Sequence, residues 1–230
     1  MTEPATDPAT HTIGRPSTSE GIAAAIRARI LDATLGAGQR LTEMDCAAEY
    51  DVGRGRVREA FRILVGEGYL EFLANRGVRV RHYSRTEILD MGRAREVIEG
   101  LAARLAAERP LVTGDRDRLS ALQSRMDEAE AGKDHQAYAE LNRAYHGLIA
   151  ALAQNAYVAD VLERVRIPAV RLQLPDSFAA DALTSSNADH RVVTAAILNA
   201  NGDAAEAAMR AHIRAGNAHI AGLPADVLSD

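Results

Sequence analysis

The chain has 230 residues, 47% of them apolar, so it can bury a sizeable core in one large domain or two of ordinary size. Aromatic residues make up only 4%, tryptophan is absent and alanine is abundant, a balance that favours a mostly helical protein. The single cysteine, Cys46, excludes an internal disulfide, and no segment reaches the roughly 20 apolar residues of a membrane span. We therefore expect a cytoplasmic protein with no membrane partner.

The positive charge is concentrated in one stretch of the chain. A net charge of −5 argues on its own against nucleic acid, but eight arginines and only three acidic residues lie between Arg54 and Arg85. A basic patch on an otherwise acidic chain is typical of a DNA-binding module joined to a second domain.

The first third of the chain contains short helices followed by a hairpin. Residues 1–18 are rich in Thr, Pro, Ala and Asp without periodicity, so we expect a disordered tail. Apolar spacing, together with Thr42 and Asp45 as a candidate capping box, predicts three helices at residues 22–35, 42–50 and 54–65. Two short apolar runs then enclose an Asn-Arg-Gly turn and predict a hairpin with strands at 69–73 and 78–81. Over residues 19–83 this order predicts a winged helix-turn-helix.

The rest of the chain reads as helices alone. Alanine- and leucine-rich segments predict helices at about 86–108, 115–131, 135–153, 156–173, 187–200 and 203–221. The stretch from Pro175 to Ser186 is expected to be a break. We predict an all-α bundle over residues 86–222 and a C-terminal tail at 223–230.

Several motifs resemble a known family. The resemblance to the winged helix of GntR-family transcription regulators is carried by Leu41-Thr42-Glu43, Ala47-Ala48-Glu49, the run from Val52 to Phe61, and Gly77-Val78-Arg79-Val80. The run from Arg95 to Glu99 and a later set of histidines resemble the FadR-type (FCD) effector domain. The likeness covers about Ile22 to Gly222 and implies a mostly α protein, a winged helix followed by a helical bundle, that binds DNA and is not an enzyme.

Two groups of residues are candidates for reading DNA. Arg54, Arg56 and Arg58 lie in the first turns of the helix that would enter the major groove, where arginine can reach phosphates or a guanine edge. The tip of the wing would touch the backbone or the minor groove, and it consists of Asn75, Arg76 and Gly77.

The recognition helix departs from the family pattern. Gly53 stands where the family usually has Ser or Thr, and Gly55-Arg56 stand where it often has Thr-Pro. Gly53 lacks a hydroxyl that could cap the helix, and Arg56 adds a charge. We therefore expect an operator sequence that differs from those of close relatives.

Histidines in three predicted helices form a candidate metal site. Asn142 and His146 are four residues apart and share a helix face. His190 lies eleven residues before Asn201 and His212 ten after Gly202, so in antiparallel helices both lie about 16 Å from the turn. Converging imidazoles suit Zn²⁺ or Ni²⁺. The FCD resemblance implies the same metal ligands, Asn142, His146, His190 and His212.

A dication held by neutral ligands makes a positively charged pocket, so the expected effector is a small carboxylate. Arg95 matches the arginine of the first FCD helix and is a candidate clamp for that anion, with Arg171 as a second candidate. The alternative for Arg95 is an ion pair with Glu99 on the next turn of its helix.

We interpret the chain as a DNA-binding regulator, a repressor, whose operator binding is controlled by a carboxylate at the metal site. A homodimer formed by the helical domain matches a palindromic operator of double-stranded DNA. Two alternatives stay open: a metal-responsive regulator with no organic effector, and a metal-dependent hydrolase.

Overall fold

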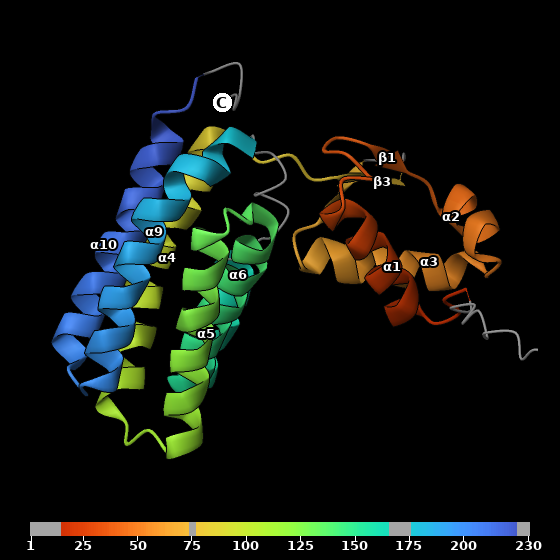
Figure 1. The fold of residues 1–230 in the computed structure, drawn as a ribbon. Coiled ribbons are helices and arrows are strands. Elements are labelled where there is room, and N and C mark those ends of the chain that lie inside the picture. The colour runs from red at the N-terminus through yellow and green to blue at the C-terminus, as the bar shows by residue number, and fades with distance from the viewer. Residues whose placement is uncertain (1–14, 74–76, 166–175, 225–230) are drawn as a thin grey trace, which may run out of the picture. The chain divides into compact units, whose positions relative to one another are not determined.

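A computed structural model describes residues 15–73, 77–165 and 176–224 of the chain, with side chains from residue 186 onward in the last range. The contacts within the chain divide it into two compact units between Arg81 and His82 (Figure 1). Each unit has its own buried apolar residues. The two units are therefore described separately.

The first unit contains three helices and a small sheet. Its elements are α1 (Ser19–Leu31), β1 (Arg40–Leu41), α2 (Glu43–Tyr50), α3 (Arg54–Gly66), β2 (Leu70–Leu73) and β3 (Gly77–Val80). Side-chain oxygens cap two of the helices, since Thr18 accepts from the backbone N–H of Gly21 and Thr42 accepts from that of Asp45. The first helix begins earlier and ends earlier than the predicted 22–35.

The wing is a three-stranded antiparallel sheet in the order β1-β3-β2. The predicted hairpin is confirmed, but β1, which pairs Leu41 with Val78, is absent from the prediction because two residues carry no alternating pattern. Gly77 has φ +87°, and a Cβ there would lie 2.6 Å from the carbonyl oxygen of Leu41. Glycine is therefore needed where β3 begins beside β1.

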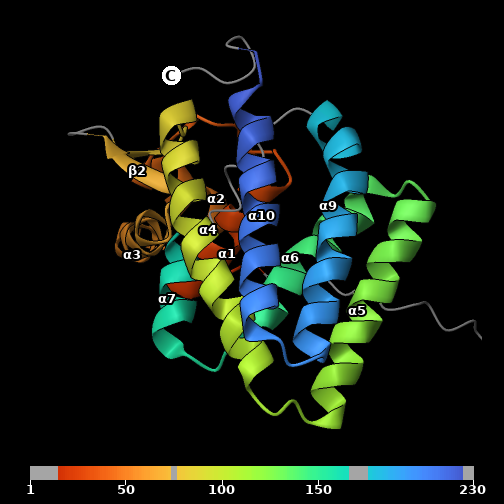
Figure 2. The ribbon, with the colours of Figure 1, turned by 90° about the vertical axis from the view of Figure 1, so that its left-hand side faces the viewer.

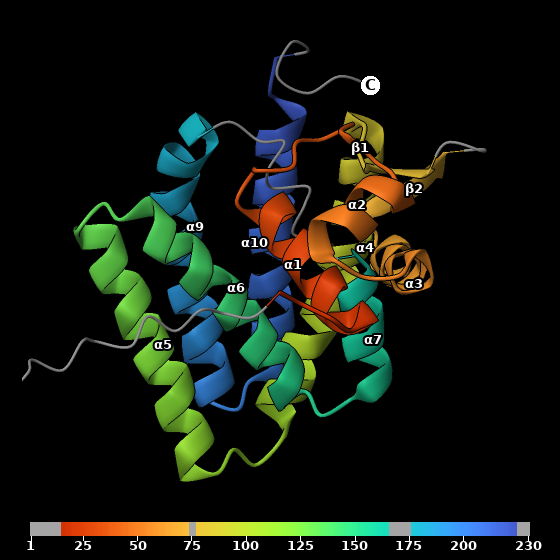
Figure 3. The same cartoon turned by 90° about the vertical axis from the view of Figure 1, so that its right-hand side faces the viewer.

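The second unit is a bundle of long helices, as the sequence predicts. The described helices are α4 (Arg85–Glu108), α5 (Thr113–Ala131), α6 (His135–Leu152), α7 (Ala156–Val165), α9 (Asp176–Leu198) and α10 (Gly202–Ala221). Helix α10 packs between α4 and α9, and α9 packs in turn on α5 (Figure 2). Helix α6 contacts α4, α5 and α9, and α7 packs on α4 and α6 (Figure 3).

The predicted break between Pro175 and Ser186 is wrong, because α9 begins at Asp176. Pro175 precedes the helix instead of interrupting it, and the Thr-Ser-Ser-Asn run that resembles a loop lies inside the helix. Local helix propensity, on which the prediction of a break depends, is a weak guide, and α9 as a whole packs on α5 and α10. Helix α7 ends at Val165, and the remainder of the predicted 156–173 segment lies outside the described residues.

Polar side chains lie within the apolar core of the bundle. Alongside residues such as Ala103, Met126 and Ile197, the fully or nearly buried groups include one carboxylate and three imidazoles, those of Glu99, His146, His190 and His212. Buried polar groups need partners, so this cluster is the first place to look for a binding site. None of the described helices is long and apolar enough to cross a membrane.

Candidate metal centre and nucleic-acid interface

Three histidines from three helices converge in the core of the second unit. His146 lies on α6, His190 on α9 and His212 on α10. The Nε2 atom of His190 is 3.4 Å from that of His146 and 3.2 Å from that of His212. One ring nitrogen of each lies within 4.8 Å of the others, a spacing that can hold a metal ion.

The spacing of these nitrogens fits tetrahedral coordination. A Zn–N bond is about 2.0–2.1 Å long, so two nitrogens of a tetrahedral site lie about 3.3 Å apart. The two Nε2 distances at His190, 3.4 and 3.2 Å, lie on either side of that value. These two distances thus suit a zinc-sized ion bound between His190 and each of the other two rings.

The outer nitrogens of two of these rings have polar partners. Nδ1 of His146 lies 2.5 Å from Oε2 of Glu99. Because a carboxylate has no proton to donate, Nδ1 carries the hydrogen and Nε2 keeps its lone pair. Nδ1 of His190 lies 3.1 Å from the hydroxyl of Tyr138, which can donate to Ser186 and accept from the imidazole. The contact with Glu99 therefore favours a neutral His146 ring with the lone pair of Nε2 directed inward, and the contact with Tyr138 is compatible with the same form of His190.

The third ring is less firmly held. Nδ1 of His212 is buried and has no hydrogen-bond partner within the described residues. The nearest carboxylate oxygen, Oδ2 of Asp189, is 3.6 Å away, beyond a normal hydrogen bond. Asp189 is the residue before His190, so α9 supplies both a ring and an acidic neighbour.

Burial keeps these imidazoles neutral. Desolvation, reinforced by the neighbouring rings, lowers the pKa of His190 far below its usual range. The pKa of His212 falls to about 3, with burial as the main cause and His146 as the next. Near neutral pH both side chains therefore offer lone pairs rather than positive charge, which is the form that binds a metal.

A fourth candidate ligand atom, an oxygen, is available from α6. Asn142 lies one turn before His146, and its Oδ1 atom is buried without a hydrogen-bond partner among the described residues. A buried carbonyl oxygen left unpaired is costly unless something binds it. A cation bound within reach of Oδ1 would satisfy this atom.

The two candidate effector-binding arginines differ in what the structure describes. Nε of Arg95 donates to Glu99 over 2.9 Å, which is the intrahelical ion pair considered as the alternative. Arg171 lies outside the described residues. The buried carboxylate also corrects the expectation that only neutral groups surround the histidine cluster, because Glu99 brings a negative charge that Arg95 balances.

On the first unit, α3 presents arginines to solvent. Its buried side carries Val57 and Phe61, whereas Arg54 and Arg56 are exposed and form no ion pair within the described residues. Gly53 is the N-cap and makes no side-chain cap bond, as its lack of a side chain predicts. The first turn of α3 therefore offers free cations and uncapped backbone N–H groups, both suited to phosphates.

Arg58 differs from its two neighbours. Its guanidinium donates two 2.7 Å hydrogen bonds to the carboxylate of Glu43, at the start of α2. The bond with Arg58 lowers the pKa of Glu43, so the pair stays charged over a wide pH range. Arg58 is held in one orientation before any DNA arrives.

The tip of the wing is only partly described. Asn75 and Arg76 lie outside the described residues, and Gly77 lies at the start of β3. Beside it, Arg79 donates to Glu71 across the β2–β3 pair. In the structure, Gly77 allows the backbone of β3 to approach β1 closely.

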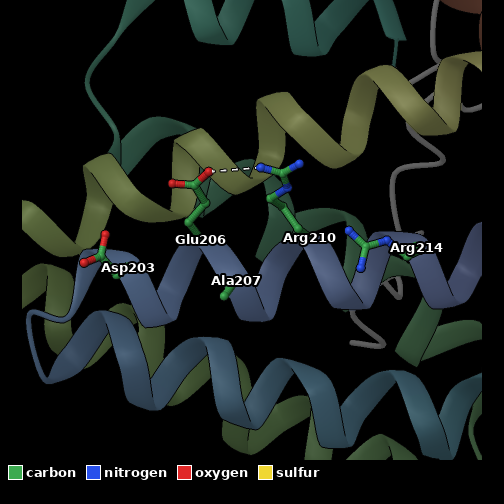
Figure 4. Close-up of a pocket in the computed structure, with 5 residues that line it drawn as sticks. All are labelled: Asp203, Glu206, Ala207, Arg210 and Arg214. Atoms are coloured by element: carbon green, nitrogen blue, oxygen red, sulfur yellow. Dashed lines mark hydrogen bonds and ion pairs between the residues drawn. The ribbon is translucent and has the colours of Figure 1, made fainter.

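A surface pocket along α10, hereafter the groove, has none of the three histidines in its lining (Figure 4). The side chains that line it are Asp203, Glu206, Ala207, Arg210 and Arg214. Its charges are paired with their neighbours: Arg210 with Glu206, Asp203 with Arg104, and Arg214 with Glu96. The groove therefore offers no unpaired charge for a ligand.

The sequence prediction missed the partners of the functional side chains. Glu99, Tyr138 and Asp189 lie next to the histidines, and Glu43 holds Arg58. A signal existed for Glu99, since it shares a helix face with Ala102, Ala103 and Ala106, all buried. A carboxylate on a buried face needs a partner, but the sequence could not say that this partner is His146.

Comparison with known proteins identifies both halves of the chain. Residues 18–80 match the family described as "Bacterial regulatory proteins, gntR family". Residues 90–215, more than half of the chain, match the FCD domain. The winged helix-turn-helix and the helical bundle are thus those of one known combination of domains.

The most similar proteins include transcription regulators. The chain is 28% identical to the "Probable D-xylose utilization operon transcriptional repressor" of Paenarthrobacter nicotinovorans, over 77% of each chain. It is 28% identical to the "Nta operon transcriptional regulator" of Aminobacter aminovorans, over 77% of this chain and 82% of that protein. A solved GntR transcriptional regulator of Rhodococcus sp. RHA1 is 27% identical, with a TM-score of 0.72 over 90% of this chain and 98% of that one.

Proposed function

Because this chain belongs to the GntR family of bacterial regulatory proteins and carries an FCD domain, we propose that its bundle senses a small molecule through a bound divalent metal. Its relatives regulate transcription and are not enzymes, so the hydrolase alternative is set aside. In this proposal residues 19–83 bind operator DNA in the cytoplasm and residues 86–222 bind the effector. The protein acts as a repressor that the effector controls.

The observation that carries the metal proposal is the convergence of three buried Nε2 atoms. A cation at the centre of His146, His190 and His212 would accept lone pairs from all three Nε2 atoms, whereas without it only hydrogen bonds between the rings can join these nitrogens. The nitrogen donors favour Zn²⁺ or Ni²⁺ over hard cations such as Mg²⁺. Asn142 would supply a fourth ligand atom, a neutral oxygen.

The proposed effector is a carboxylate that completes the coordination of the metal. Glu99 and Arg95 balance one another, so the charge of the dication remains for an anion to meet. Arg95 is one-third exposed, and it could reach a carboxylate with the guanidinium nitrogens that Glu99 does not occupy. Arg171 remains a second candidate by its position in the sequence.

One observation favours a second function, in which the metal alone is the signal. Arg95, the best candidate for an anion clamp, already donates to Glu99. If that pair also occupies Arg95 when the ion is bound and its remaining nitrogens do not reach an organic acid, the metal is the only ligand that the site detects. The protein would then report metal concentration.

We also propose a homodimer, with its surface on α4 and α7. These helices pack together, and on each an exposed apolar pair lies one helical turn apart: Val97 and Leu101, and Tyr157 and Val161. A second copy would bury this patch twice about a two-fold axis, as a palindromic operator requires. Val97→Glu and Tyr157→Glu should each shift light scattering from dimer toward monomer, whereas Val192→Glu on α9 should not. Unchanged dimers in both variants would refute this surface.

The experiment for the proposed function measures operator binding in four states. An operator is selected from random duplex DNA by the zinc-loaded protein, and fluorescence anisotropy then compares zinc-loaded and chelator-stripped protein. Each is tested with and without acetate, succinate and citrate as carboxylate probes. A carboxylate effect that needs zinc supports the metabolite proposal, and an effect of zinc alone supports the metal sensor. If DNA affinity is identical in all four states, the bundle does not sense through this site.

A further inference from the structure

The three histidines of the cluster have different polar neighbours. His146 faces a full negative charge on Glu99, His190 faces the neutral hydroxyl of Tyr138, and His212 lies 3.6 Å from Asp189. Glu99 is also the most buried of the acidic groups described here, with about 1% of its side chain exposed. A buried carboxylate is costly, so its retention beside one ring needs a reason.

Three side chains form a hydrogen-bonded series from the solvent to the ring of His146. Arg95, one-third exposed, donates to Oε1 of Glu99, and Oε2 of the same carboxylate accepts from Nδ1 of His146. The carboxylate is thus held from both sides. It fixes the His146 ring with Nε2 toward His190 and His212 rather than toward Glu99.

Resting on the proposed metal site, we infer that Glu99 is a positioning residue: its carboxylate fixes the Nδ1–H form of His146 and strengthens Nε2 as a ligand. Glu99 does not coordinate the ion in this account, because the ligand nitrogens that converge are those of the three histidines. Partners of this kind generally alter metal affinity about 10- to 100-fold.

Arg95 then has a defined effect on the same site. By donating to Glu99 it withdraws electron density from the carboxylate, which weakens the bond to His146. Replacing Arg95 by methionine should leave metal binding intact or tighten it. Replacing Glu99 should weaken metal binding, so of the two members of this ion pair only Glu99 is expected to be needed for metal binding.

The test is a competition titration of Zn²⁺ between full-length protein and a chromophoric chelator. Glu99→Gln keeps the shape and removes the charge, and we expect about 10- to 100-fold weaker zinc binding. The matched control is Glu96→Gln on the same helix, whose carboxylate pairs with Arg214 at the surface, and it should bind zinc as the wild type does. Substituted Co²⁺ gives a second readout, because a displaced His146 changes the visible spectrum of a tetrahedral site.

A wild-type measurement keeps the inference testable if Glu99→Gln does not fold. Nitrogen-15 NMR of the metal-free protein should find the hydrogen of His146 on Nδ1, and a hydrogen on Nε2 would overturn the inference. Equal zinc affinity and equal cobalt spectra in wild type and Glu99→Gln would overturn it as well. If the wild type itself binds no zinc, the proposed metal site fails, which is a distinct result.

Discussion

The recognition helix of the first unit and the histidine cluster of the second differ in exposure and in how their side chains are paired. On α3, Arg54 and Arg56 remain exposed and unpaired within the described residues, ready for a ligand that brings its own negative charge. In the bundle, three imidazoles are buried, burial lowers the pKa of His190 and of His212, and Nδ1 of His146 and of His190 faces a polar group of the protein itself. A surface site can consist of residues from one short segment. A buried site needs residues from several helices, including polar side chains that bind the functional groups.

The largest effect is expected from the centre of the buried site. His190 is the ring whose Nε2 atom approaches both of the others, so His190→Ala should reduce bound zinc from about one ion per chain to nearly none. Chelator should then no longer lower the melting temperature. The control is His219→Ala, an exposed histidine of the same helix as His212. A variant without His190 that still retains one zinc per chain would place the ion elsewhere.

The exposed site should respond by a graded loss of DNA affinity. Arg54→Ala and Arg56→Ala should each weaken operator binding about 5- to 150-fold and reduce its salt dependence by about one ion. Arg62→Ala, further along α3 and paired with Glu59, is the control. Anisotropy titrations at several salt concentrations measure both quantities. Wild-type affinity in both variants would mean that the first turn of α3 does not meet the DNA.

The effect of replacing Arg58 should differ from that of replacing Arg54 or Arg56, because Arg58 alone is paired with Glu43. Glu43 holds its guanidinium through two hydrogen bonds, so Arg58→Ala also releases Glu43 as an unpaired carboxylate near the DNA. The comparison of Arg58→Ala with the double variant Glu43→Gln/Arg58→Ala separates the lost contact from this repulsion. We expect the double variant to recover about tenfold of the lost affinity, since like charges in an interface are strongly unfavourable. No recovery would show that Glu43 lies away from the phosphates.

Asn142 offers a smaller change within the buried site. Asn142→Asp replaces a neutral oxygen with a carboxylate next to His146 and should tighten zinc binding by on the order of tenfold. The same change should weaken binding of a carboxylate probe such as citrate, because the cation then meets one negative charge already. Chelator competition and citrate titration measure the two effects. Tighter binding of both zinc and citrate would contradict the charge argument.

The smallest effect concerns pH. Burial holds the pKa of His212 at about 3, whereas the unfolded chain has a histidine pKa near 6.5. Below about pH 6.5 the unfolded state therefore binds more protons than the folded one, so stability of the metal-free protein is full above that pH and falls as pH decreases toward 3. Between pH 7.5 and 5.5 the melting temperature of chelator-treated protein should fall by about 2 to 5 °C. His212→Gln should show a smaller fall, and an equal fall would assign the effect to other groups.

Local patterns predicted much of both sites. The positions of α3 and of the hairpin follow from apolar spacing and turn residues, and the equal height of His190 and His212 follows from their distances to the α9–α10 turn. These inferences need only one helix or one turn at a time. The short strand β1 was not predicted because its pairing with β3, a distant segment, determines it, and the start of α9 was not predicted because its residues have weak helix propensity.

The partners could not be predicted for a related reason. Glu99 meets His146 across 47 residues of sequence, and Glu43 meets Arg58 from a different helix. Periodicity places Glu99 on the buried face of α4, but the choice among the buried histidines depends on how α4 packs on α6. The charges that surround a site are therefore the part that three-dimensional structure adds.

The most direct test is X-ray diffraction from crystals of the full-length protein grown with Zn²⁺, recorded on both sides of the zinc absorption edge. We expect one strong anomalous peak in each chain, about 2.0–2.1 Å from Nε2 of His146, His190 and His212. An anomalous map with no peak among these three rings, from crystals that contain zinc elsewhere, would contradict the metal centre and leave the histidines as core residues.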